Sequence, residues 1–184
     1  MRRAAATSLG TWLSAVGVAL LVAGAASAQP APDEAATPAA ATIPHVRASD
    51  PLAADVLRRA VLGSPTVAGL VAQLDQSDLI VNIVTGPLPD SLNGYTRVTA
   101  ATSAVRYLRV TLRIPGATPR LIATLGHELR HAVEIAGMPD VRCDASLAAA
   151  YRRVGVSMAR DGMFETDAAV AVGRTVAREL ATRH

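Results

Sequence analysis

The chain has no lysine and a single cysteine, and these two features restrict the classes of protein to which it can belong. Cys143 alone cannot form an internal disulfide; it is either a zinc ligand or simply a small apolar residue. The 18 basic residues, all arginine, are nearly balanced by 15 acidic residues, and the formal charge is only +3 at pH 7. So small a basic excess, despite the high isoelectric point, does not indicate nucleic-acid binding.

Residues 1–28 have the pattern of a secretory signal peptide. Arg2 and Arg3 give a positive start, residues 12–25 form an apolar core, and Ala26-Ser27-Ala28 is an A-x-A cleavage site. The core is too short for a confident membrane span, although an uncleaved anchor and a twin-arginine signal are alternatives. Cleavage would leave about 156 residues, with 16 arginines against 15 acidic residues. We therefore expect export to the periplasm or the extracellular space, without a stable membrane anchor.

Residues 29–48 are rich in Ala, Pro and Thr and show no apolar period. This composition is typical of a flexible tether, and a propeptide is the alternative. His45, near its end, has no partner motif, so we expect its side chain to be exposed. The remaining residues, 49–184, are long enough for one domain with a proper core.

Caps and apolar periods within 49–184 predict an α+β domain. Helices are predicted from about Pro51 to Leu62, Pro65 to Gln73, Thr118 to Ala136, Asp144 to Arg153 and Phe164 to Thr182. Asp50 before Pro51 indicates the N-cap of the first helix, Gly63-Ser64-Pro65 ends it and opens the second, and Gly137 can end the third. Strands are expected over 79–84, 97–101 and 105–114. We thus expect a small twisted sheet of about three strands, packed with the helix over 118–136 and a C-terminal helix that carries Glu165.

The helix predicted over 118–136 contains His127-Glu128-Leu129-Arg130-His131, a His-Glu-x-x-His motif. Residues four apart lie on one helix face roughly one turn apart, so both imidazoles can bind one zinc ion. Glu128 is placed to act as general base on a metal-bound water. Random placement of the chain's histidines and glutamates would give about 0.002 such matches, so the motif predicts a metal site. Two core or solvent histidines without a role are the alternative.

A catalytic zinc site usually has three protein ligands, and the third must come from elsewhere in the chain. Glu134 lies one turn further along the helix, where a pair with Arg130 or a role in orienting a ligand fits better. Asp144 is better explained as a helix cap. Glu165 is the favoured ligand, because small residues follow it at helical spacing and would allow a close helix approach; a favourable charge at the helix N-terminus is the alternative.

His127, Glu128, His131 and Glu165 resemble the pattern of the gluzincin zinc metallopeptidases, and the segment around them is similar to exported bacterial proteins with Leu-Gly-His-Glu-Leu-x-His-Ala-x-Glu. The resemblance implies a zincin-like fold and a peptide or protein substrate added as a strand along 105–114. Many gluzincins carry an Asp four residues after the Glu ligand, where this chain has Ala169.

The sequence therefore predicts an exported zinc-dependent peptidase, with Zn²⁺ held by His127, His131 and Glu165 and with Glu128 as general base. The alternative is a non-catalytic exported binding module that keeps the fold. Tyr151 lies within range in sequence, but a Tyr on an apolar helix face is more often a core residue.

Overall fold

The structure is a computed structural model that describes residues 44–116, 118–153 and 164–182. The predicted signal peptide (1–28), the tether up to residue 43 and the predicted loop over 156–163 lie outside the described residues. None of the described helices combines the length and the hydropathy needed to cross a membrane.

The described residues form five helices and a four-stranded mixed sheet, which confirms the predicted α+β class. The helices are α1 (Pro51–Gly63), α2 (Pro65–Leu74), α3 (Thr118–Ala136), α4 (Asp144–Arg153) and α5 (Asp167–Ala181). The strands are β1 (Val46–Ala48), β2 (Leu79–Gly86), β3 (Gly94–Ala101) and β4 (Arg106–Arg113).

Strand β1 makes the sheet larger than the predicted three strands. The strand order is β1-β2-β4-β3, in which β1, β2 and β4 run parallel and β3 is antiparallel to β4. Val46 is buried and pairs with Val81, so the predicted tether over 29–48 ends before β1. The prediction that His45 is exposed is also wrong, because it is half-buried and its backbone N–H donates to Asp75 Oδ1 at 2.9 Å.

Strand β4 is paired on both sides, with β2 and with β3. Its predicted alternation is confirmed, since Leu108, Val110 and Leu112 are fully buried. However, the expectation that a substrate adds as a strand along 105–114 is wrong, because no edge of β4 is free in the sheet. The sheet ends on that side at β3, which a chain-order argument could not identify.

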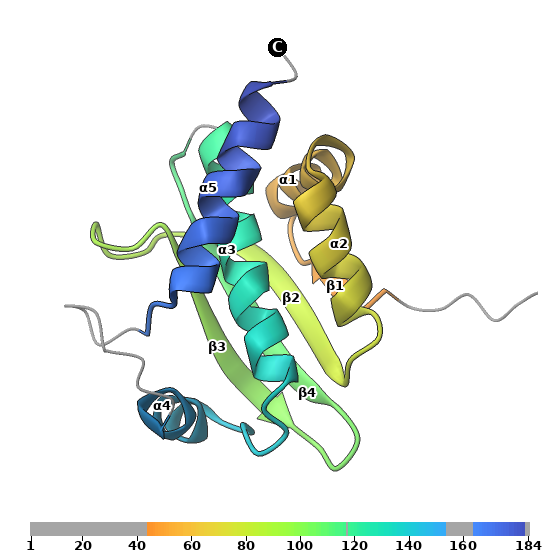
Figure 1. Cartoon of the computed structure of the whole chain (residues 1–184), viewed down its shortest axis with the longest axis vertical. Helices are drawn as coiled ribbons and strands as arrows, with labels where there is room; N and C mark the ends of the chain where they lie inside the picture. The colour runs from red at the N-terminus through yellow and green to blue at the C-terminus, as the bar shows by residue number, and fades with distance from the viewer. Residues whose placement is uncertain (1–43, 117, 154–163, 183–184) are drawn as a thin grey trace, which may run out of the picture. The chain divides into compact units, whose positions relative to one another are not determined.

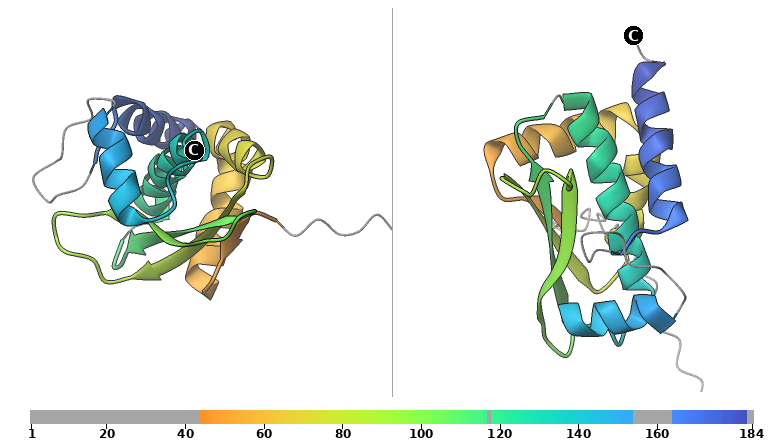
Figure 2. Two further views of the ribbon diagram at one scale, coloured as in Figure 1. Left: turned by 90° about the horizontal axis from the view of Figure 1, so that it is seen from below. Right: turned by 90° about the vertical axis from the view of Figure 1, so that its left-hand side faces the viewer.

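Helix α3 lies against the sheet and is covered on its far side by α5 (Figures 1 and 2). Helices α1 and α2 begin at the predicted caps: Asp50 accepts from Ala53 N at 2.8 Å, and Ser64 accepts from Val67 N at 3.1 Å. Both contact α3, which buries Leu125 and Leu129 completely. The core therefore lies between the sheet and the helices and fixes α3 from several directions.

Arg106 anchors the C-terminal end of α3 to the sheet. Its guanidinium is 1% exposed and donates to backbone carbonyls at the end of α3 and just beyond it, those of Ile135, Ala136, Met138 and Val141. Both oxygens of Asp78 accept from it at 2.7 Å. A cation at a helix C-terminus is favourable, because the last carbonyls carry partial negative charge and have no intrahelical partner. Arg106 thus fixes the axial position of α3 relative to β2 and β4.

Candidate metal and catalytic site

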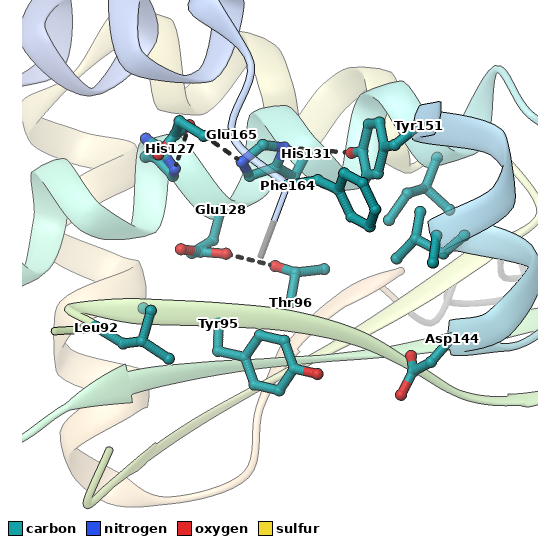
Figure 3. A pocket seen from close by; sticks show the side chains of 14 residues that line it. Leu92, Tyr95, Thr96, His127, Glu128, His131, Asp144, Tyr151, Phe164 and Glu165 are labelled. Carbon is teal, nitrogen blue, oxygen red and sulfur yellow. Dashed lines mark hydrogen bonds and ion pairs between the residues drawn. The ribbon is translucent and has the colours of Figure 1, made fainter. Parts of the chain in front are cut away.

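The structure brings His127, His131 and Glu165 together (Figure 3). Glu165 Oε1 lies 3.3 Å from His127 Nε2 and 3.6 Å from His131 Nε2. One ligand atom from each residue can be chosen so that all three lie within 4.8 Å of one another. Three ligands of one tetrahedral zinc ion, each roughly 2.1 Å from it, are about 3.4 Å apart. The spacing of this donor set therefore fits a zinc ion.

Glu165 does not belong to a helix, contrary to the prediction of a Glu-bearing C-terminal helix. Helix α5 begins at Asp167, and Thr166 is its N-cap, with the side chain accepting from Ala169 N at 3.1 Å. The predicted close approach of the two helices is present: a Cβ built on Gly173 would lie 3.4 Å from His127 Cβ. The packing of α5 on α3 thus sets the position of Glu165, although the residue itself precedes the helix.

Glu134 holds His131 from the side away from Glu165. Its Oε2 lies 3.2 Å from His131 Nδ1 and accepts from the Tyr151 hydroxyl, also at 3.2 Å. Its Oε1 accepts from Thr166 Oγ1 at 2.9 Å. A carboxylate on Nδ1 fixes the ring and its tautomer, so that Nε2 faces Glu165. Glu134 therefore positions a ligand rather than adding a fourth one.

The His127 ring lies against α5, since a Cβ built on Gly173 would lie 3.7 Å from His127 Nδ1. Burial lowers the pKa of this histidine and outweighs the opposite effect of the neighbouring Ala169 backbone. Among the described residues the carboxylate in contact with His127 is that of Glu165, so His127 and His131 are positioned by different neighbours.

Glu128 is 5% exposed and points toward β3. Its Oε2 accepts from Thr96 Oγ1 at 2.7 Å. A Cβ built on Gly94 would lie only 2.5 Å from Glu128 Oε1 and 2.7 Å from Thr124 Cγ2, so a glycine at this position leaves room for the carboxylate. The sequence suggested only a turn at Asn93-Gly94, because contacts between β3 and α3 are set by the tertiary fold.

Burial and neighbouring charges shift the protonation of these groups in the metal-free protein. Burial raises the pKa of Glu128 to about 7. Burial alone would lower the pKa of His131, but hydrogen bonds to Glu134 and Glu165 outweigh it and raise the pKa to about 9. For His127 burial dominates and lowers the pKa. The site therefore holds one imidazolium and one neutral imidazole at neutral pH.

Two cavities meet at this cluster. The first, of about 220 Å³, extends toward α4 and is lined by Tyr95, Tyr151 and Phe164 (Figure 3). The second, of about 400 Å³, lies between the N-terminal half of α3 and the facing side of α5. Both are lined by His127, Glu128 and Glu165. The cluster thus lies at the middle of an open cleft, where a substrate can reach it from either side.

Three other residues, Asp144, Cys143 and Tyr151, have surroundings that the sequence did not predict. Asp144 is the first residue of α4, but its side chain accepts from Val98 N at 2.8 Å, so it ties α4 to β3 rather than capping the helix. Cys143 is exposed and contacts Ser146, outside the metal cluster. Tyr151 is 3% exposed, and its hydroxyl takes part in the Glu134 network, a role that its apolar helix face did not reveal.

Comparisons of this chain with protein-family models, with curated proteins and with solved structures found no match.

Proposed function

We propose that this chain is a zinc-dependent peptidase of the gluzincin kind. The observation that carries the proposal is the convergence of His127 Nε2, His131 Nε2 and Glu165 Oε1 in an open cleft, with the Glu128 carboxylate on the next residue of the same helix. Three protein ligands with an open position characterise catalytic zinc sites, whereas structural sites are closed by four.

His127, His131 and Glu165 would hold the ion. When bound, Zn²⁺ supplies Lewis acidity, which polarises a carbonyl and lowers the pKa of a water to about 7. Glu134 accepts a hydrogen bond from His131 Nδ1–H and thereby keeps His131 Nε2 directed at the site. This support matters because a ligand that can rotate loses metal affinity by 10- to 100-fold.

Glu128 is placed for the proton transfers of peptide hydrolysis. Its Oε2 is held by Thr96, and Oε1 makes no hydrogen bond to a described residue, so this oxygen is available to take a proton from the attacking water. The same carboxyl can then give that proton to the leaving amine. The buried environment keeps bulk water from competing for the proton.

Strand β3 offers the substrate an edge beside the cluster. Val98 N bonds to Asp144 and not to β4, and residues two apart in a strand direct their N–H and C=O groups to the same side. Gly94 and Thr96 therefore present their backbone groups outward, and both line the cleft. An extended peptide paired with them would lie across the His127–His131 face of α3.

The Glu128→Gln variant tests this proposal. We expect the purified chain, with zinc supplied, to cleave peptides in a mixture analysed by mass spectrometry. Glu128→Gln should keep the zinc and lose hydrolysis by at least 100-fold, as expected for removal of a general base. A wild-type chain that binds zinc and peptides but never cleaves them would instead identify a non-catalytic binding module.

We also propose that the chain acts after export, because residues 1–28 have the signal-peptide pattern. Expressed with its own N-terminus in a secreting bacterium, the exported protein should begin at Gln29. Retention of residues 1–28 in a cytoplasmic protein would contradict this assignment.

A further inference from the structure

The second cavity differs in charge from the first. It is lined by Arg120 from α3 and Arg174 from α5, whereas none of the described residues that line the first cavity is an arginine. At the far end of the first cavity stands Asp144, whose carboxylate lies 3.5 Å from Arg97 Nη2 and accepts from Val98 N. The two arginines therefore mark one end of the cleft as basic, with the His-His-Glu cluster between that end and Asp144.

Both arginines have guanidinium N–H groups that make no hydrogen bond with the described residues. Arg120 is exposed and uses Nη2 to donate to Asn93 Oδ1 at 2.8 Å, which fixes its head but leaves most of its five N–H groups free. Arg174 is exposed and makes no hydrogen bond or ion pair with the residues that the structure describes. Arg113, by contrast, is paired with Asp90 at 2.9 Å. Guanidinium groups with free forks suit a carboxylate, which they can bind through two parallel hydrogen bonds.

The direction of β3 determines which end of a bound peptide would lie near the two arginines. The strand begins at Gly94, which lines the second cavity, and passes Val98, which is bonded to Asp144 at the far end of the first. A peptide that pairs antiparallel with β3 runs the opposite way, from Asp144 toward Arg120 and Arg174. Antiparallel pairs outnumber parallel ones about two- to three-fold. The carboxyl-terminal part of such a peptide would therefore enter the basic end.

We propose that Arg120 and Arg174 bind a carboxylate on the C-terminal side of the cleaved bond, an inference that rests on the proposed peptidase function. The carboxylate is either the free C-terminus of a short peptide or an acidic side chain. Arg120 and Arg174 would be specificity-determining residues, because both line the second cavity and neither belongs to the His-His-Glu cluster. The substrate class is then peptides that end in, or carry, a negative charge just beyond the scissile bond.

Binding measurements can test this separately from catalysis. The zinc-loaded full chain with Glu128→Gln would be titrated with N-terminally labelled hexapeptide mixtures by fluorescence anisotropy. One mixture lacks acidic residues and has a free C-terminus, a second is the same but amidated, and a third is amidated and contains Glu. The titrations would be repeated with Arg120→Gln and Arg174→Gln together, and with Arg178→Gln as the control, an exposed arginine of α5 that lines neither cavity.

We expect the free C-terminus, the Glu-containing mixture or both to bind about tenfold more tightly than the amidated mixture, as a charge-assisted hydrogen bond predicts. Whichever of the two is preferred identifies the source of the carboxylate. The preference should vanish in the Arg120/Arg174 double variant and persist in Arg178→Gln. Equal binding of all three mixtures, no binding of any, or a preference that survives the double variant would overturn the proposal.

Cleavage by the wild-type chain separates this inference from the function on which it rests. Hydrolysis of all three mixtures without preference would leave the peptidase in place and reject the carboxylate site. Binding with the expected preference but without hydrolysis would reject the peptidase and leave the arginine pair as a carboxylate-binding site.

Discussion

Replacing Gly94 by alanine tests whether Glu128 acts from the position that the structure gives it. The added Cβ would lie 2.5 Å from Glu128 Oε1 and 2.8 Å from Glu128 Cγ. An ordinary contact needs roughly 3.4 Å, so the carboxylate must move by nearly 1 Å. Because Glu128 and Thr124 are side-chain neighbours that can shift, we expect the variant to fold and to bind zinc.

A displacement of about 1 Å in a catalytic group reduces the rate by roughly 100-fold, which corresponds to about 2.7 kcal/mol of transition-state stabilisation. The assay is kcat/KM for a cleaved peptide, measured beside the zinc content and the unfolding midpoint of each protein. Gly86→Ala is the matched control, since its Cβ would meet only Thr111 Cγ2 at an ordinary 3.9 Å. A kcat/KM for Gly94→Ala within threefold of the wild type, with zinc retained, would refute the assigned role of Glu128.

Three further predictions concern the fold and the metal. Arg106→Met should lower the free energy of unfolding by about 3–5 kcal/mol in urea titrations, because Asp78 and four carbonyls lose their shared donor; a loss below 1 kcal/mol would contradict the anchoring role. Glu134→Gln should weaken zinc binding by about 10- to 100-fold in chelator competition, whereas unchanged affinity would mean that Glu134 does not orient His131. Because the pKa of metal-free His131 is raised to about 9, its proton is bound below that pH and must leave when zinc binds. Zinc affinity should therefore fall about tenfold per unit as the pH drops from 9 to 7, and calorimetry in buffers of different ionisation enthalpy should show about one proton released; a pH-independent affinity would be inconsistent with this.

The elements were predictable where local chemistry decides them. Asp50 and Ser64 before prolines marked the starts of α1 and α2, and Gly137 marked the end of α3, because caps and helix breakers act within a few residues. The two histidines share a helix face for the same local reason. The small residues that follow Glu165 correctly indicated a close approach of α5 to α3, although Thr166 and not an earlier residue caps α5.

The features that the sequence did not predict depend on contacts between distant segments. Strand β1 has three residues in an Ala- and Pro-rich context, and only its pairing with β2 defines it. The order β1-β2-β4-β3 places β4 inside the sheet, whereas its position in the chain suggested an edge. Thr96 and Gly94 reach Glu128 from 32 and 34 residues away in sequence, so no spacing rule could have linked them to the motif.

The metal itself is the most direct test of the account. The purified chain, supplied with zinc and then dialysed, would be measured for metal content beside His131→Ala and Glu165→Ala, with Asp140→Ala as the control, an exposed acidic residue outside the cluster. We expect close to one zinc per wild-type and per Asp140→Ala chain, and loss of zinc in both ligand variants. A wild-type chain that retains no zinc would contradict the peptidase proposal, and zinc retained by Glu165→Ala would show that Glu165 is not the third ligand.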